Sequence, residues 1–132
     1  MFVDASVFVA IIKPEDDGSA LAERLEQARN PISSPIAVVE AVMSLGRQKR
    51  IPADIAYAAV SDLLERAAIE IAPIDGETGA LAVDAHARFG KGSGHPARLN
   101  LGDCFAYALA VTSGEPLLYK GGDFTMTDVA RA

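Results

Sequence analysis

Apolar residues along the chain follow two patterns, short continuous runs and longer stripes with a helical period. The runs at residues 1–3, 68–74 and 117–119 predict buried strands, and residues 31–34 are a further candidate strand or turn. Helical spacing predicts helices at residues 5–12, 19–29, 35–50, 52–67, 78–89 and 103–111. Because short strands alternate with helices, we predict an α/β fold, an α/β/α sandwich with a short, mostly parallel central sheet.

The predicted helix from Asp103 to Val111 is almost entirely apolar, yet it begins with a carboxylate. Asn100 and Gly102 are suitable start residues, so Asp103 falls in or beside the first turn, where the helix dipole favours a negative charge. Asp103 is either a simple cap or one member of an acidic cleft. The acidic cleft is favoured if other acids can reach the same place, and the simple cap is favoured if they cannot.

Three further acids are expected at the same edge of the sheet. Asp4 and Asp123 each follow an apolar strand directly, while Glu40 and Asp103 lie near helix starts. In a parallel α/β sheet the carboxyl ends of the strands and the following helix starts share one edge, which is where sites form. We therefore expect these four carboxylates to lie close together.

Carboxylates that lie close together repel one another, so such a cluster needs raised pKa values or bound cations. Oxygen ligands without nearby Cys or His favour Mg²⁺, with Mn²⁺ able to substitute. We expect Asp4 and Asp103 to be direct ligands, and Glu40 and Asp123 to bind a second ion or orient water. Ser6 hydrogen-bonds an acid or a water at this site, caps the helix that follows, or does both. Such sites hydrolyse phosphodiester bonds.

Length and charge narrow the function further. The 132 residues suit a single domain over residues 1–132, and the net charge of −6 argues against indiscriminate nucleic-acid binding. Local cations would have to contact phosphates, and Arg98 and Lys120 are the best placed; the run from Arg47 to Arg50 is typical of a solvated helix end. The single Cys104, the absence of a leader and the absence of a long apolar run indicate a cytoplasmic protein without membrane association.

Four segments, taken in order, carry a resemblance to a known family. They are Phe2-Val3-Asp4-Ala5-Ser6, Ala37-Val38-Val39-Glu40, the stretch from Asn100 to Ala110 that begins Asn-Leu-Gly-Asp-Cys, and Pro116 to Phe124 followed by Thr127-Asp128. Together they resemble the PIN-domain ribonucleases, and among them the VapC toxins. One position departs: relatives often have a polar or acidic residue where this chain has Gly122. We therefore assign the fourth acid to Asp123, with Asp128 as the alternative or as a residue that holds the tail.

The resemblance implies a Mg²⁺-dependent endoribonuclease that arrests growth by cutting an RNA, commonly a tRNA or ribosomal RNA. It also implies a homodimer and inhibition by a VapB-type antitoxin. Two other readings remain open. A catalytically silent binding module would use its acids only as caps. A phosphatase with Asp4 as nucleophile is disfavoured, because that chemistry requires a second acid where this chain has Ser6.

Overall fold

The computed structural model describes residues 1–13, 16–49 and 51–132, so Arg50, which ends the predicted basic run, lies outside the described residues. Strands and helices alternate as the sequence pattern predicts. The strands are β1 (Phe2–Val3), β2 (Ile32–Ser33), β3 (Glu70–Ile71) and β4 (Leu117–Leu118). The helices are α1 (Ala5–Ile12), α2 (Gly18–Glu26), α3 (Pro35–Lys49), α4 (Ala53–Arg66), α5 (Gly76–Phe89) and α6 (Leu101–Ser113).

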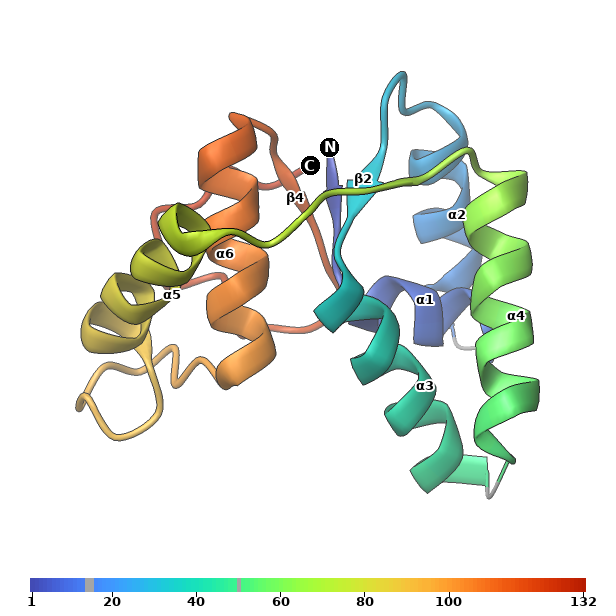
Figure 1. The fold of residues 1–132 in the computed structure, drawn as a ribbon, viewed down its shortest axis with the longest axis horizontal. Helices are drawn as coiled ribbons and strands as arrows, with labels where there is room; N and C mark the ends of the chain where they lie inside the picture. The colour runs from blue at the N-terminus through green and yellow to red at the C-terminus, as the bar shows by residue number, and fades with distance from the viewer. Residues whose placement is uncertain (14–15, 50) are drawn as a thin grey trace.

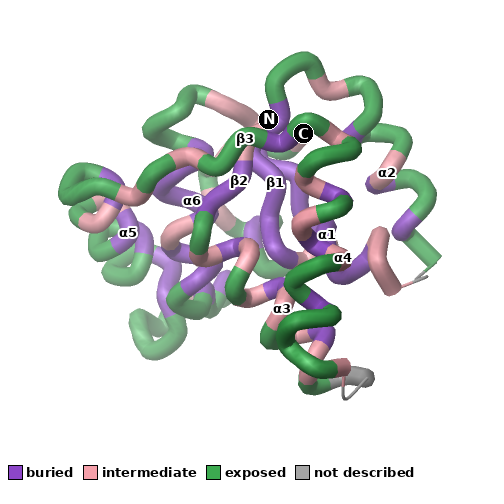
Figure 2. Tube along the Cα trace, turned by 45° about the vertical axis from the view of Figure 1, so that its right-hand side comes forward, coloured by how far each residue is buried: buried purple, intermediate pink, exposed green. Residues whose placement is uncertain are grey.

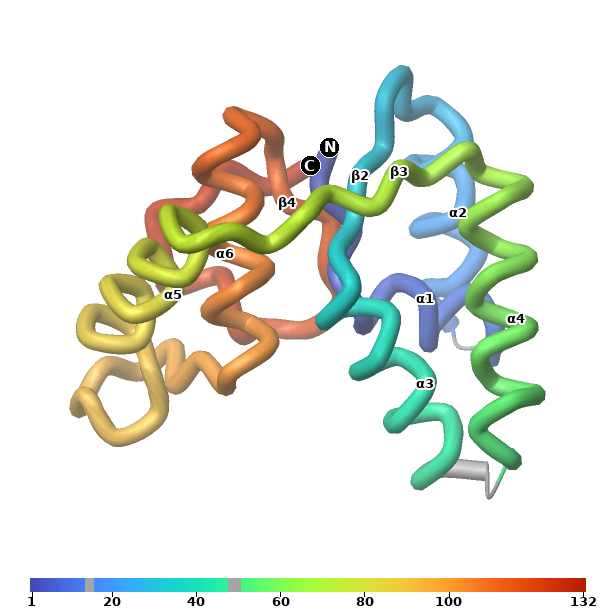
Figure 3. The backbone as a smooth tube through the Cα atoms, viewed as in Figure 1, coloured from blue at the N-terminus to red at the C-terminus, as the bar shows by residue number. Residues whose placement is uncertain are grey.

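The strands form one sheet in the order β3-β2-β1-β4, and every pairing in it is parallel. Phe2 of β1 is in register with Ile32 on one side and with Leu117 on the other. Figure 1 shows α5 and α6 on one face of the sheet and α1 to α4 on the opposite face, and Figure 3 shows the same layers as a tube with β3 at the sheet edge. The predicted α/β/α sandwich with a parallel sheet is confirmed.

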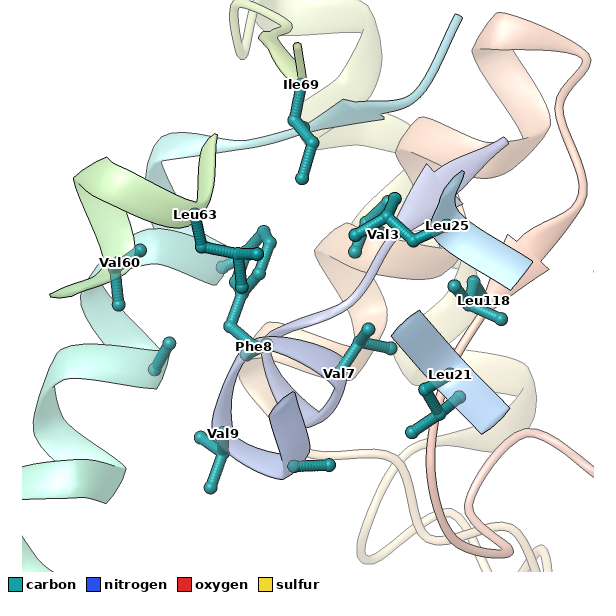
Figure 4. Packing of buried hydrophobic residues seen from close by; sticks show 14 of the residues in the cluster. Val3, Val7, Phe8, Val9, Leu21, Leu25, Val60, Leu63, Ile69 and Leu118 are labelled. Carbon is teal, nitrogen blue, oxygen red and sulfur yellow. The ribbon is translucent and has the colours of Figure 1, made fainter. Parts of the chain in front are cut away.

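The paired strands β1 and β4 are each only two residues long, but each contributes to both layers of the core. Since successive strand side chains point to opposite faces, Phe2 and Leu117 pack against α5 and α6, whereas Val3 and Leu118 pack against the other layer. Figure 2 shows β1 as buried. Figure 4 shows Phe8 of α1 extending toward α4, in the core cluster that also contains Val3 and Leu118. Full burial of a side chain of this size contributes about 1.5–3 kcal/mol to folding.

The strand predicted at residues 68–74 is much shorter in the structure. Only Glu70 and Ile71 pair with β2, at one edge of the sheet, and both are exposed. The next backbone N–H, that of Ala72, still reaches Ser33, but Pro73 has no N–H to continue the ladder. Ile69 is buried in the core, and Ala72 and Ile74 are partly buried against it, so the apolar residues of this segment still contribute to packing.

Two helix starts position the acidic side chains. The Ser34-Pro35 pair begins α3 as its sequence predicts, and the Ser34 hydroxyl accepts a hydrogen bond from the N–H of Ala37 at 3.1 Å. At α6, the Asn100 side chain accepts from the N–H of Asp103 at 3.0 Å, and the Asp103 carboxylate accepts from the N–H of Asn100 at 2.8 Å. This reciprocal capping fixes the backbone on which Asp103 stands. No helix in the described part of the chain is long and apolar enough to cross a membrane.

Candidate active site

One cleft, with a volume of ≈ 310 Å³, is bordered by the carboxyl ends of β1 and β4, by the starts of α1 and α6, and by α3 from Glu40 to Arg47. The four acids singled out in the sequence all line it: Asp4, Glu40, Asp103 and Asp123. In Figure 1, α1 and α3 leave the end of the sheet near which α6 begins. The fold therefore brings four separate segments of the chain, and one carboxylate from each, into a common space.

Asp4 is buried at the end of β1, where it caps helix α1. Its Oδ2 accepts hydrogen bonds from the backbone N–H of Ser6 at 2.9 Å and from the Ser6 hydroxyl at 2.5 Å. The Ser6 oxygen in turn accepts from the N–H of Lys120 at 2.9 Å. Burial raises the pKa of Asp4, although these hydrogen bonds favour its ionised form. The cap of this helix is thus Asp4, and the interpretation of Ser6 as the cap is wrong. Ser6 instead contacts the acid and connects the end of β1 to the segment after β4.

Asp103 is both a cap and a member of the cleft, so the two sequence alternatives are not exclusive. One carboxylate oxygen is used in the capping box with Asn100, and the side chain also lines the cleft. Burial is the main cause that raises the pKa of Asp103 to about 6, and the charges of Asp4 and Asp123 add to it. An ion-free cleft thus holds this carboxylate at an energetic disadvantage in its charged form.

Glu40 reaches the cleft from the opposite side, on α3. Burial raises the pKa of Glu40 to about 7, and the charges of Asp4 and Asp103 contribute, while Arg47 opposes the rise. Glu40, Ser44 and Arg47 all line the cleft, at positions i, i+4 and i+7 of one helix. In the sequence, the run from Arg47 to Arg50 is typical of a solvated helix end, and the helical spacing of Arg47 from Glu40 is the signal that indicates the cleft face.

The cations predicted to meet phosphate differ in position. Lys120 lines the cleft and forms an ion pair with Asp17 at 3.6 Å. Arg98 is exposed in the loop before α6 and is not among the residues that line the cleft, so its contact with RNA stays a prediction. Its backbone has a φ of 53°, an uncommon conformation for a residue with a side chain.

Asp128, the alternative fourth acid, is held outside the cleft. It accepts hydrogen bonds from Arg88 at 2.6 Å and from the Tyr107 hydroxyl at 2.7 Å. These bonds lower the pKa of Asp128, with the bond from Tyr107 as the larger cause. Asp123, by contrast, is exposed at the cleft and is close enough to Asp4 and Asp103 to raise their pKa values. The geometry favours Asp123 as the fourth acid and Asp128 as the residue that holds the tail against α5 and α6.

Asparagine substitutions should separate these two roles. We expect Asp123→Asn to weaken Mn²⁺ binding and RNA cleavage by about tenfold, near the lower end of effects seen for groups that support a metal site, without changing thermal stability. Asp128→Asn should leave Mn²⁺ binding unchanged and lower the unfolding midpoint by a few degrees, because it removes the ion pair with Arg88. Calorimetric Mn²⁺ titration and thermal unfolding of both variants measure this; the reverse assignment of effects would make Asp128 the fourth acid.

The donor set of the cleft suits a hard divalent cation. Its carboxylates supply oxygen ligands, and none of the described residues that line it is His or Cys. Cys104 and His86 instead line a separate, mainly apolar cavity beside α5 and α6. Among residues 1–13, 16–49 and 51–132, no group of three or more Asp, Glu, His or Cys side chains forms a ready metal cage. Mg²⁺ does not need one, because it binds through one or two carboxylates and keeps several waters.

The fold and cleft define an α/β/α protein with an acidic site at the carboxyl edge of its parallel sheet. The PIN domain family model matches residues 1–130. A VapC ribonuclease of Rhizobium meliloti is 47% identical over 141 residues, covering 97% of this chain and 98% of the relative. Ribonuclease VapC28 of Mycobacterium tuberculosis is 42% identical over 132 residues, covering 100% of this chain and 97% of the relative. The chain belongs to the PIN-domain family and, within it, to the VapC ribonucleases.

Solved structures agree on the fold. The Mycobacterium tuberculosis toxin VapC20, described as cleaving the sarcin-ricin loop, superposes with a TM-score of 0.78 at 16% identity, covering 99% of this chain and 97% of that one. VapBC2 from Rickettsia felis, bound to a DNA fragment from its promoter, superposes with a TM-score of 0.68 at 14% identity, covering 99% and 96%. At these identities the likeness concerns the fold alone.

Proposed function

We propose that this chain is a Mg²⁺-dependent endoribonuclease and the toxin component of a type II toxin–antitoxin pair. The observation that carries the proposal is the cleft, where Asp4, Glu40, Asp103 and Asp123 converge and where burial raises three of their pKa values. Relatives that share 42% and 47% of their residues with this chain are named ribonucleases and match it over nearly their whole length, which supports RNA as the substrate class.

Each acid has a distinct role in this proposal. Asp4 and Asp103 hold the cation, since both are buried and each is fixed by a hydrogen bond from a neighbouring backbone N–H. When bound, Mg²⁺ supplies positive charge against the scissile phosphate and increases the acidity of a water. Glu40 stands on the facing helix and accepts the proton of the attacking water. Asp123 helps to orient the water at the open side of the cleft.

The RNA backbone would approach along the cations of the cleft rim. Arg47 and Lys120 line the same cleft as the acids but come from different segments, α3 and the turn after β4. In this proposal they contact phosphates on either side of the scissile bond, and Arg98 contacts RNA farther from it. Because the whole chain carries a net charge of −6, such local contacts are required for binding. The substrate class is a tRNA or ribosomal RNA.

The proposed partners are a VapB-type antitoxin and a second copy of this chain. Large apolar side chains are exposed beside the cleft: Val39 and Met43 on α3 are 55% and 54% exposed, and Leu101 at the start of α6 is 75% exposed. Val39 and Met43 line one hollow, and Leu101 lines both this hollow and a second one. Exposed apolar patches of this kind mark interaction sites, and we assign this one to a homodimer. We propose that residues 1–132 act as a single nuclease domain in the cytoplasm.

Sequencing of RNA ends after brief induction tests the function directly. Wild-type protein should generate new 5′ and 3′ ends at one or a few sites in a tRNA or ribosomal RNA, and growth should stop unless the antitoxin is co-expressed. Asp103→Asn, expressed to the same level, should generate none of these ends. Identical RNA ends in both cultures would favour the silent binding module instead.

A further inference from the structure

Gly102 lies in the first turn of α6, directly before Asp103, and it is buried against Glu40 of α3. A methyl group built on its Cα would overlap the carboxyl carbon and both carboxylate oxygens of Glu40. The Glu40 carboxylate therefore occupies the volume that any other residue at position 102 would fill with its side chain.

The backbone does not explain why position 102 is glycine. Gly102 is part of a helix and is absent from the glycines with a positive φ, so an L-amino acid could adopt its conformation. Within a helix, glycine is also less favourable than alanine. The observed residue thus opposes local helix stability, which leaves the space needed by Glu40 as its structural reason.

We propose that Gly102 is a positioning residue that sets the place of the Glu40 carboxylate in the acidic cleft. This inference rests on the proposed metal-dependent ribonuclease. The residues that collide distinguish Gly102 from Gly90: at Gly90, a Cβ would overlap the backbone of His86 as well as its side chain, whereas the three atoms nearest a Cβ at Gly102 all belong to the carboxylate end of the Glu40 side chain. A larger residue at position 102 would therefore displace Glu40 and leave the fold in place.

Gly102→Ala tests the proposal, with Gly79→Ala as the matched control. Gly79 is also a helical glycine, but a Cβ there meets nothing within 4 Å. We expect Gly102→Ala to stay folded, with an unfolding midpoint no lower than that of the wild type, and to weaken Mn²⁺ binding and RNA cleavage by about 10- to 100-fold, as expected when the support of a metal site is disturbed. Gly79→Ala should bind Mn²⁺ and cleave RNA as the wild type does.

A double-mutant cycle with Glu40→Asp shows whether the effect passes through Glu40. Aspartate is one methylene shorter, so its carboxylate withdraws from the space above Gly102. Gly102→Ala should therefore cost little additional cleavage or Mn²⁺ affinity in the Glu40→Asp background, because the two changes act on the same contact. Equal losses in both backgrounds would overturn the role of Gly102.

The outcomes also separate this inference from the proposed function. If the wild type cleaves RNA and binds Mn²⁺, and Gly102→Ala does both equally well, only the positioning role is overturned. If the wild type neither binds Mn²⁺ nor cleaves RNA, the proposed function fails and the role of Gly102 toward the ion fails with it. A loss of cleavage accompanied by unfolding of Gly102→Ala would contradict the claim that only the Glu40 side chain must move.

Discussion

Asp103→Asn is expected to abolish RNA cleavage while it stabilises the ion-free protein at neutral pH. Asparagine keeps an oxygen that can accept the hydrogen bond from the N–H of Asn100, so the capping box of α6 is retained. What is lost is one of the two charges that we propose hold the cation. We expect cleavage to fall by about 100- to 1,000-fold or more, the loss typical for one group that stabilises transition-state charge.

The stabilisation follows from the raised pKa. Burial raises the pKa of Asp103 to about 6, so at pH 7.5 the ion-free protein keeps a charge in a site that disfavours it. Removing that charge should increase the free energy of unfolding by about 1–2 kcal/mol, since one pKa unit corresponds to about 1.4 kcal/mol and solvent reduces part of the effect. Asp4→Asn should behave in the same way, because asparagine is also a good helix cap.

Cleavage of RNA by purified protein and thermal unfolding in a chelator measure the two effects together. Asp62→Asn is the control: Asp62 is exposed on α4, forms an ion pair with Arg66 at 2.7 Å, and should change neither quantity. Full cleavage by purified Asp103→Asn would remove this residue from the site. Lower stability of the ion-free variant would instead assign Asp103 a purely structural role.

Two features allowed the acids to be predicted from the sequence: their apolar surroundings and the topology of the sheet. Asp4 interrupts an apolar run and Asp103 opens an apolar helix, so each stands out as a charge among apolar residues. Their common edge followed from the parallel sheet, because strand ends and helix starts in such a sheet face the same way. Local pattern and topology therefore sufficed for the acids and for the layers of the fold.

Contacts between distant segments were not predictable in this way. Arg88 meets Asp128 across 40 positions, and the apposition of Gly102 and Glu40 depends on how α3 packs against α6. The sequence contains each partner but not the angle between the helices that brings them together. Arg47 is an intermediate case: its helical spacing from Glu40 was visible, but the cationic run around it resembled an ordinary solvated helix end.

The ion-free protein should lose stability as the pH rises from about 5 to about 8, because several carboxylates are harder to ionise when folded. Burial raises the pKa of Glu40 to about 7 and of Asp103 to about 6, from ordinary values of 4.5 and 3.8. In this interval the folded state holds more protons than the unfolded state. Stability contributed by these groups is thus fully present below their ordinary pKa values and is lost as the pH passes through the raised ones.

Mg²⁺ should reverse this loss, since it binds the ionised carboxylates and replaces their protons. We expect saturating Mg²⁺ to raise the unfolding midpoint at pH 8 by at least about 4 °C, which corresponds to about 1 kcal/mol in a domain of this size, and to have little effect at pH 5. Chelation should abolish RNA cleavage, and added Mg²⁺ or Mn²⁺ should restore it.

Calorimetric unfolding scans at both pH values test the effect of Mg²⁺ on stability, with Glu40→Gln as the control that loses much of the pH dependence. An equal effect of Mg²⁺ at pH 5 and pH 8 would mean that the ion binds elsewhere, because at pH 5 the carboxyl groups of Glu40 and Asp103 are still largely protonated and compete with it.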